Sequence, residues 1–210
     1  MTAYIQLEGG DGVGKSCAAK ALYRALTDLG HRCALTSEPT TSTIGALIRD
    51  RLRGGYGSTQ SLQLLCAADR MEHSAKICTW LDAGTIVIVI GDRGALSTWA
   101  YALAMADAAD DPRAEEIAAW ADGLSRWAVE PSLIIVLQAD IGACLARLEA
   151  KKRDVTESAK IQRLVHAAYA GAHRSRLGHL VEYVDANGSE NEVSERVVAV
   201  ALKHLAAVKP

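Results

Sequence analysis

The sequence predicts an α/β fold of three layers, with about five parallel strands flanked by helices. Two observations lead to this prediction. Short apolar runs, several of them rich in β-branched residues, alternate with longer amphipathic stretches along the chain. A glycine-rich segment, residues 9–16, lies between the first run and the first stretch, as in strand–loop–helix units that bind phosphate. Strands that are separated by helices pair in parallel through right-handed crossovers.

The apolar runs are expected to form the strands. The third run is continuous and mostly β-branched, which is typical of a strand buried on both faces. Pro131 stands before the fourth run, so that strand is expected to begin after it. The predicted strands are residues 3–7, 32–36, 85–90, 133–137 and 180–184.

The amphipathic stretches are expected to form the helices. The first ends before Gly30, in the manner of a C-terminal glycine cap. Gly54, Gly55 and Gly57 interrupt the second stretch, and Gly84 ends the third. The predicted helices are residues 15–29, 44–52, 61–82, 95–108, 113–127, 141–152, 160–176 and 192–208.

Length and composition limit the class of protein. The 210 residues suit one domain, residues 1–210, and we expect no signal peptide before the first motif. Half of the residues are apolar, and the net charge of −2 does not indicate nucleic acid or a membrane as a partner. The five cysteines are scattered without metal-ligand spacing, which favours free thiols in a reducing cytoplasm.

The glycine-rich segment matches G-x-x-x-x-G-K-S/T without a gap. Glycines allow backbone N–H groups to surround an anion, and the following helix adds the positive end of its dipole. Lys15 would offer a cation to the β- and γ-phosphates, and Ser16 a hydroxyl ligand to Mg²⁺. The residues predicted to bind ATP are Gly9, Gly10, Asp11, Gly12, Val13, Gly14, Lys15, Ser16 and Cys17.

GTPases, motor ATPases and kinases share such a loop. The sequence contains no N/T-K-x-D motif for reading guanine, and the short chain favours a small-molecule kinase over a motor ATPase. An inert nucleotide-binding protein is the remaining alternative. The presence of Lys15, Ser16, Asp92 and Arg93 together argues against it.

Further motifs follow in an order that resembles the thymidylate kinases, a family of P-loop nucleoside-monophosphate kinases. The matching segments are YIQLEGGDGVGKS (4–16), SEPT (37–40), LLCAADR (64–70), DR (92–93), STWAY (97–101), PSL (131–133) and DA (185–186). The resemblance covers almost the whole chain. It implies the P-loop kinase fold with a short lid near residues 150–160, and Mg²⁺-dependent transfer of the γ-phosphate of ATP to dTMP. A kinase for dUMP or a 5-modified pyrimidine deoxynucleotide is the alternative.

The resemblance implies roles at the phosphate end of the site. Lys15, Asp11 and Arg93 would be catalytic, and Arg93 would grip the acceptor monophosphate with its planar fork. Ser16 and Asp92 would be the metal ligands, since hydroxyl and carboxylate oxygens suit a hard cation.

The resemblance also implies the acceptor pocket. Pro39 would pack beside the 5-position of the base, Arg70 would donate to its 4-keto oxygen, and Tyr101 would occupy the space of a ribose 2′-OH. The complete set of predicted substrate-binding residues is Asp11, Glu38, Pro39, Cys66, Arg70, Arg93, Ser97 and Tyr101.

The sequence departs from the family at the base. Cys66 stands where the family has a phenylalanine that stacks on thymine, Gly94 replaces a tyrosine, and Ala102 replaces a glutamine. Either the pocket is roomier, or Trp99 refills it.

The lid departs as well. The family's D-R-x-E is DVTE at residues 154–157, so its arginine is missing, and Arg153 is the predicted catalytic cation beside Lys151 and Lys152. The same three cations could instead be a solvated helix end.

Thymidylate kinases are generally homodimers, so the resemblance implies one here. The apolar stretches 61–80 and 95–108 could supply its interface or pack internally.

Overall fold

A parallel sheet of five strands forms the centre of the computed structural model, which describes residues 2–54, 57–150 and 159–207. The strand order is β2-β3-β1-β4-β5, and each pairing is parallel, as the alternation of runs and stretches predicts. The strands are β1 (Ala3–Glu8), β2 (Cys33–Ser37), β3 (Ile88–Asp92), β4 (Leu133–Gln138) and β5 (Val181–Asp185).

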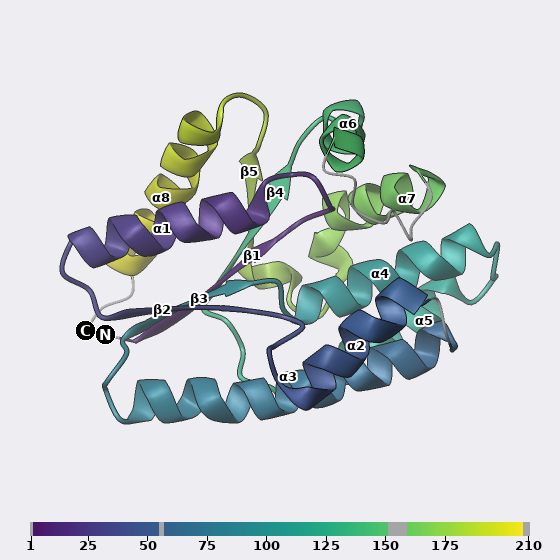
Figure 1. Cartoon of the computed structure of the whole chain (residues 1–210), viewed down its shortest axis with the longest axis horizontal. Helices are drawn as coiled ribbons and strands as arrows, with labels where there is room; N and C mark the ends of the chain where they lie inside the picture. The colour runs from purple at the N-terminus through teal and green to yellow at the C-terminus, as the bar shows by residue number, and fades with distance from the viewer. Residues whose placement is uncertain (1, 55–56, 151–158, 208–210) are drawn as a thin grey trace.

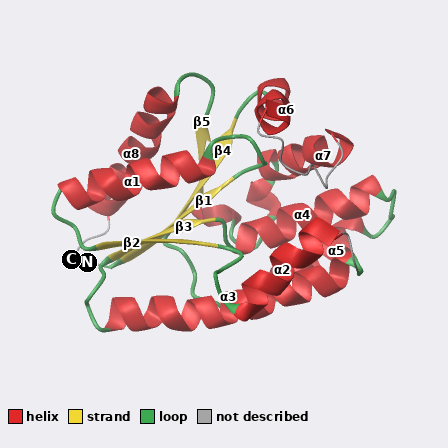
Figure 2. Ribbon diagram, viewed as in Figure 1, coloured by secondary structure: helices red, strands yellow, loops and turns green. Residues whose placement is uncertain are grey.

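Helices cover both faces of the sheet, which confirms the predicted three layers (Figure 1, Figure 2). One face is covered by α1 (Lys15–Asp28) and α8 (Glu190–Ala207), which pack on each other. The other is covered by α3 (Thr59–Asp82), α4 (Ala95–Ala108) and α7 (Ala159–Ala170). The remaining helices are α2 (Thr43–Gly54), which packs on α3, α5 (Ala114–Gly123), which packs on α4, and α6 (Ile141–Ala150), which packs on α7.

Alternation along the strands divides the core between the two faces. Ile5 and Leu7 pack in the cluster with α1 and α8, whereas Tyr4 packs in the cluster with α3. On β4, Ile134 and Val136 join the cluster with α4 and α7. Each fully buried aliphatic side chain of this kind stabilises the fold by about 1.5–3 kcal/mol. The central strands β1, β3 and β4 are buried on both faces.

Several boundaries differ from the predicted ones. β3 begins at Ile88 rather than at residue 85, because residues 85–87 form the connection from α3 to the sheet. α5 ends at Gly123 rather than at residue 127, because the chain turns and buries Ser125. α7 ends at Ala170, and two short 3₁₀ helices follow, Ala172–Arg174 and Gly178–Leu180.

Within the described part of the chain, no helix combines the length and the apolar character needed to cross a membrane.

Candidate active site

The phosphate loop connects β1 to α1 at the carboxyl edge of the sheet. Its backbone adopts positive φ angles at Gly9, Gly12 and Gly14, of 136°, 83° and 97°, which L side chains rarely tolerate. A Cβ atom at Gly12 would also lie 2.5 Å from the carbonyl oxygen of Cys144 on α6. The glycines are therefore required by the turn itself, which ends at the amino terminus of α1.

Lys15 is the first residue of α1, and its side chain turns back over the loop. Its Nζ atom donates a hydrogen bond to the carbonyl oxygen of Gly10 at 2.7 Å and lies 3.8 Å from Oδ1 of Asp11. Burial, aided by the nearby Arg93 cation, lowers the pKa of Lys15 to about 8, although Asp11 and Asp92 act in the opposite direction. A bound phosphate would favour the charged form, so Lys15 suits a site that receives an anion.

Asp11 joins the phosphate loop to residues from three other elements. It forms an ion pair with Arg93, and its Oδ2 atom accepts hydrogen bonds from the Tyr101 hydroxyl at 3.0 Å and from Nε2 of Gln162 at 3.3 Å. Burial raises the pKa of Asp11, but the charges of Arg93 and Lys15 outweigh it and hold that pKa well below its usual range. Asp11 is therefore an ionised carboxylate between two cations.

Arg93 directly follows β3 and has a backbone φ of 76°, in the left-handed region. A non-glycine residue adopts this conformation at an energetic cost, which the surrounding structure must offset. The Arg93 N–H donates to the carbonyl oxygen of Leu7 at 3.0 Å, and Nη1 donates to the Ser97 hydroxyl at 3.3 Å. The guanidinium is thereby aimed at Asp11 and the phosphate loop.

Ser16 and Asp92 meet at the same edge. The Ser16 hydroxyl donates a hydrogen bond of 2.5 Å to Oδ2 of Asp92, the last residue of β3. Both groups present oxygen to the cavity in front of the phosphate loop, and they fit the ligand preference of Mg²⁺, which completes its octahedron with substrate phosphates and water. Among the described residues, no cluster of three or more His, Cys, Asp or Glu side chains could hold a metal by itself.

Glu8 is a site residue that sequence reasoning missed. This carboxylate ends β1 with no exposed surface, and it accepts hydrogen bonds from the Ser97 hydroxyl at 2.7 Å and from the Tyr169 hydroxyl at 2.9 Å. Burial raises the pKa of Glu8, against the lowering effect of Ser97 and Arg93. Ser97, which is predicted to bind substrate, is thus hydrogen-bonded to both Glu8 and Arg93. Its spacing from Glu8 in the sequence, 89 residues, carries no signal of this contact.

His166 of α7 also went unnoticed. Its Nε2 atom lies 3.2 Å from the carbonyl oxygen of Asp11, and a Cβ atom at Gly10 would approach the imidazole to 2.2 Å. Burial lowers the pKa of His166, so the ring favours its neutral form. The ring packs against the phosphate loop and restricts position 10 to glycine.

A second cavity of about 410 Å³ lies between α2, α3 and α4. It contains a buried ion pair between Glu38 and Arg70, with Nη2 of Arg70 2.8 Å from Oε2 of Glu38. Arg70 also donates from Nη1 to the Ser125 hydroxyl at 2.6 Å and from Nη2 to the carbonyl oxygen of Gly94 at 3.0 Å. His73 binds the other Glu38 oxygen at 3.0 Å. These bonds fix the guanidinium and leave one N–H of Nη1 for which the structure describes no acceptor.

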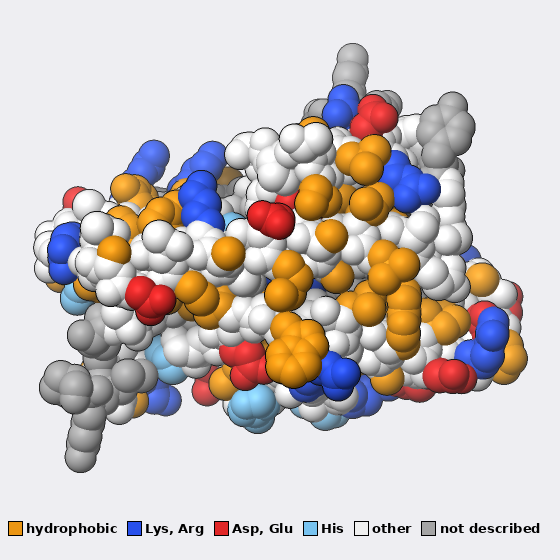
Figure 3. Space-filling model, turned by 90° about the horizontal axis from the view of Figure 1, so that it is seen from below, with side chains coloured by type: hydrophobic (Ala, Val, Ile, Leu, Met, Phe, Trp, Pro, Cys, Tyr) orange, Lys and Arg blue, Asp and Glu red, His pale blue; other side chains and the backbone are white. Residues whose placement is uncertain are grey.

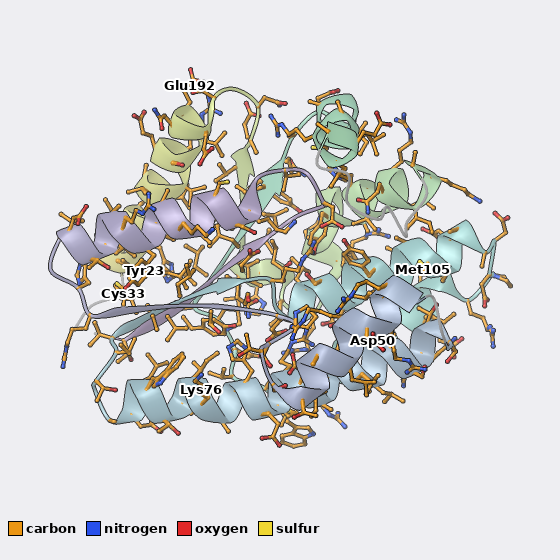
Figure 4. All side chains as sticks on the ribbon, viewed as in Figure 1. Tyr23, Cys33, Asp50, Lys76, Met105 and Glu192 are labelled. Atoms are coloured by element: carbon orange, nitrogen blue, oxygen red, sulfur yellow. The ribbon has the colours of Figure 1, made fainter. Side chains whose placement is uncertain are left out.

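The outer part of this cavity is apolar. Met105 of α4, labelled in Figure 4, lines it. Ile48 and Leu52 of α2 line it as well. Cys66 also lines it, but Trp99 does not, because the indole is 3% exposed within the cluster of α4 and α7. The gap left by the missing aromatic ring is therefore not refilled by Trp99.

The structure gives a separate reason why position 94 is a glycine. A Cβ atom there would lie 2.3 Å from Nε2 of Gln6, whose side chain is 2% exposed and donates to the Tyr4 hydroxyl. The space that a side chain at position 94 would need is thus occupied from β1.

The first cavity, in front of the phosphate loop, has about the same volume, 410 Å³. Besides the loop it is lined by Arg147 of α6 and by residues that begin α8, and Nη1 of Arg147 donates to the carbonyl oxygen of Gly12 at 3.1 Å. The two cavities share Asp11, Glu38, Arg93 and Leu148. They therefore form one continuous site, with a phosphate-binding loop at one end and the buried Arg70 at the other.

The predicted lid residues Lys151, Lys152 and Arg153 lie outside the described residues. All other predicted site residues line one of the two cavities or, in the case of Gly9 and Gly10, the loop between β1 and the cavities.

Comparisons with known proteins agree on one family. The family model described as "Thymidylate kinase" matches residues 7–197. A thymidylate kinase of a Synechococcus strain is 32% identical over 94% of this chain and 93% of its own length. A probable thymidylate kinase of Methanococcus maripaludis is 31% identical over 80% of this chain and 76% of its own. The solved thymidylate kinase of Candida albicans shares the fold, with a TM-score of 0.79, 23% identity and coverage of 97% of this chain and 92% of that one.

Proposed function

The chain belongs to the thymidylate kinase family, and we propose that its two cavities hold the two substrates of one phosphoryl transfer. The enzyme transfers the γ-phosphoryl group of ATP to dTMP, which yields ADP and dTDP. We assign ATP to the cavity in front of the phosphate loop and dTMP to the cavity that contains Arg70. The observation that carries this assignment is the junction of the two cavities at Asp11 and Arg93.

In the donor cavity, the backbone N–H groups of the loop and the amino terminus of α1 surround the phosphates. Lys15, held over the loop by Gly10, neutralises charge on the β- and γ-phosphates. Ser16 and Asp92 would hold Mg²⁺. This ion supplies a fixed positive charge that offsets the charge of the phosphate oxygens.

In the acceptor cavity, Arg93 would bind the monophosphate and place its attacking oxygen in line with the γ-phosphorus. Asp11 forms an ion pair with Arg93, which holds the guanidinium at the junction of the two cavities. Ser97 accepts a hydrogen bond from Arg93 and donates one to Glu8, so these two residues support the position of the guanidinium. Positioning and charge neutralisation account for most of the rate in this kind of reaction.

At the far end, the Nη1 N–H of Arg70 that has no acceptor among the described residues would meet the 4-keto oxygen of thymine, because a guanidinium can only donate. Pro39 and Cys66 line the same cavity, and we assign the 5-methyl group to this apolar part. Tyr101, fixed through its hydroxyl to Asp11, would fill the space of a ribose 2′-OH. Arg153 of the lid is proposed as the cation that approaches the transferred phosphoryl group.

We also propose that the chain acts as a homodimer in the cytoplasm. Exposed hydrophobic side chains gather on the face that α2 and α3 form, and Figure 3 shows hydrophobic groups among charges on that side. They include Leu47, Leu52, Leu64 and Met71. Light scattering at micromolar concentration tests the pairing: a dimer mass is expected, and a monomer would contradict it. The five cysteines are all free thiols, which suits a reducing compartment.

The decisive experiment is an ADP-release assay with ATP, Mg²⁺ and a panel of nucleoside monophosphates. We expect dTMP to have the highest kcat/KM, and dCMP to fall about ten- to a hundredfold lower, because its 4-amino group would face the donor of Arg70. A preference for dUMP or a bulkier 5-substituted nucleotide would favour the alternative kinase. If none of the nucleotides in the panel is phosphorylated, the proposed kinase activity is wrong.

A further inference from the structure

Two polar side chains in the acceptor cavity have no part in the assignments above. Gln63 of α3 is 4% exposed and Thr98 of α4 is 3% exposed, and both line this cavity. Within residues 2–54, 57–150 and 159–207, Oγ1 of Thr98 is buried without a hydrogen-bond partner. The structure describes no hydrogen bond of the Gln63 carboxamide to these residues, and Gln63 lines the cavity. A buried polar group without a partner is unfavourable, and one that lines a cavity is suited to receive its partner from a ligand.

Gln63 faces the same cavity as Arg70 for a geometric reason. Gln63, Cys66 and Arg70 occupy positions i, i+3 and i+7 of α3, which lie on one side of a helix. At about 1.5 Å of rise per residue, Gln63 lies about 10 Å from Arg70 along the helix axis, with Cys66 between them. A flat ring that touches Arg70 at one edge would therefore extend over Cys66 toward Gln63.

Arg70 and Gln63 differ in the hydrogen-bonding groups that they can recognise. Arg70 is held by Glu38, Ser125 and Gly94, and it can only donate. The carboxamide of Gln63, which has no hydrogen bond to another residue in the described part of the chain, offers a donor and an acceptor side by side. A pyrimidine imide has the complementary pair, because an N3–H group stands next to a keto oxygen.

We propose that Gln63 reads the imide edge of the base, with Oε1 accepting from N3–H and Nε2 donating to the adjacent keto oxygen. Gln63 is thereby a specificity-determining residue of the acceptor site, and the proposal rests on the assignment of dTMP to this cavity. Thr98, on the opposite helix, lines the same cavity. Arg70 identifies the 4-keto group, whereas Gln63 requires a proton on N3.

The test compares dTMP with N3-methyl-dTMP, which lacks the N3 proton, in the parent and in Gln63→Met. Methionine keeps the length and volume of the side chain and removes both hydrogen-bonding groups. Gln60→Met is the matched control, because Gln60 lies on the exposed side of the same helix. We expect the parent to disfavour N3-methyl-dTMP, and Gln63→Met to raise the KM for dTMP about tenfold with little change in kcat or in the KM for ATP.

The decisive readout is the ratio of kcat/KM between the two nucleotides. In Gln63→Met this ratio is expected to approach one, while Gln60→Met keeps the parent value. A folded Gln63→Met with the parent ratio would overturn the proposal, because a purely structural role would leave the ratio unchanged.

Calorimetric binding of both nucleotides to the parent gives an independent arm, which does not depend on the folding of any variant. Equal affinity for dTMP and N3-methyl-dTMP would also overturn the proposal that Gln63 binds the N3–H group. If the parent binds dTMP and discriminates against the N3-methyl analogue but transfers no phosphate, the role of Gln63 stands and the proposed kinase reaction fails.

Discussion

The hydroxyl of Ser16 lies 2.5 Å from the carboxylate of Asp92 and donates a hydrogen bond to it, although the two residues are 76 positions apart. One follows the phosphate loop and the other ends β3. They meet because β1 and β3 pair in parallel, with Leu7 opposite Asp92, so that their carboxyl ends lie side by side. The contact joins the two predicted metal ligands.

Replacing Asp92 by Asn tests this pair as the Mg²⁺ site. The amide keeps the shape of the carboxylate but removes its charge, so we expect about ten times more Mg²⁺ for half-maximal activity. The measurement is a Mg²⁺ titration at saturating ATP and dTMP. Asp50→Asn, an exposed carboxylate on α2, is the control and should leave the titration unchanged (Figure 4). An unaltered titration in Asp92→Asn would exclude it as a ligand.

The lowered pKa of Lys15 predicts that the protein takes up a proton when ATP binds. Its pKa is lowered to about 8 by burial and Arg93, and the added phosphates should raise it again. At pH 8 about half of the free enzyme carries the proton and nearly all of the complex does, so about half a proton is taken up. Calorimetry in buffers of different ionisation enthalpy measures it. Lys15→Met should abolish the uptake and reduce kcat by about a hundred- to a thousandfold.

The lowered pKa of Lys15 also makes the stability of the fold depend on pH. The folded pKa of about 8 lies below the ordinary value of 10.5, so the unfolded chain binds more protons between these pH values. The contribution of Lys15 to the free energy of unfolding should therefore rise from pH 8 to 10.5, with Asp11, Asp92, Arg93 and Glu8 as the charges that face it. A parent that takes up no proton with ATP would show that Lys15 is already fully charged.

Replacing Arg93 by Ala should raise the KM for dTMP and lower kcat, with little change in the KM for ATP. An arginine that both holds and aligns the acceptor phosphate affects both parameters, by about a hundredfold together in kcat/KM. Steady-state kinetics with each substrate varied in turn provides the measurement. Arg24→Ala on the exposed side of α1 is the control. A change confined to the KM for ATP would place Arg93 in the donor site.

Tyr101 is expected to select deoxyribose by its bulk. Tyr101→Ala should narrow the preference for dUMP over UMP by about tenfold, since it opens the space of the 2′-OH. Tyr101→Phe keeps the ring and removes only the hydroxyl that binds Asp11, so it should retain the preference while weakening phosphate binding. If the parent and Tyr101→Ala prefer dUMP over UMP by the same factor, Tyr101 does not contact the sugar.

Cys66 leaves room beside the base. A stacked aromatic ring contributes about 1–3 kcal/mol, so Cys66→Phe should lower the KM for dTMP about tenfold and reduce tolerance of bulky 5-substituents. A clash with Trp99 is not expected, because Trp99 does not line the cavity. The KM values for dTMP and a bulky 5-substituted dUMP decide this, with Cys78→Phe on the exposed side of α3 as the control. A loss of dTMP binding in Cys66→Phe would show that the cavity is already full.

Local signals in the sequence were sufficient to predict the fold and the glycine-rich loop between β1 and α1. A buried parallel strand must be apolar and extended, and a phosphate loop must have glycines at fixed spacing, so both leave patterns within a few residues. The family motifs added the predicted acceptor residues, such as Arg70 and Tyr101, because an ordered set of short segments is specific where each single motif is weak. Boundaries such as those of α5 and β3 were less accurate, since tertiary contacts decide where a helix or strand ends.

The sequence by itself determined that this chain forms a parallel α/β sheet with a phosphate loop, because those features depend on neighbouring residues. Only the tertiary structure decided which distant groups support the site. Glu8 meets Tyr169 across 161 residues and Arg70 meets Ser125 across 55, and helix packing, not spacing, brings them together. The position of Gln63 in the wall of the acceptor cavity is likewise a property of the fold, since a glutamine on an amphipathic helix looks the same in the sequence whether water or a ligand completes its hydrogen bonds.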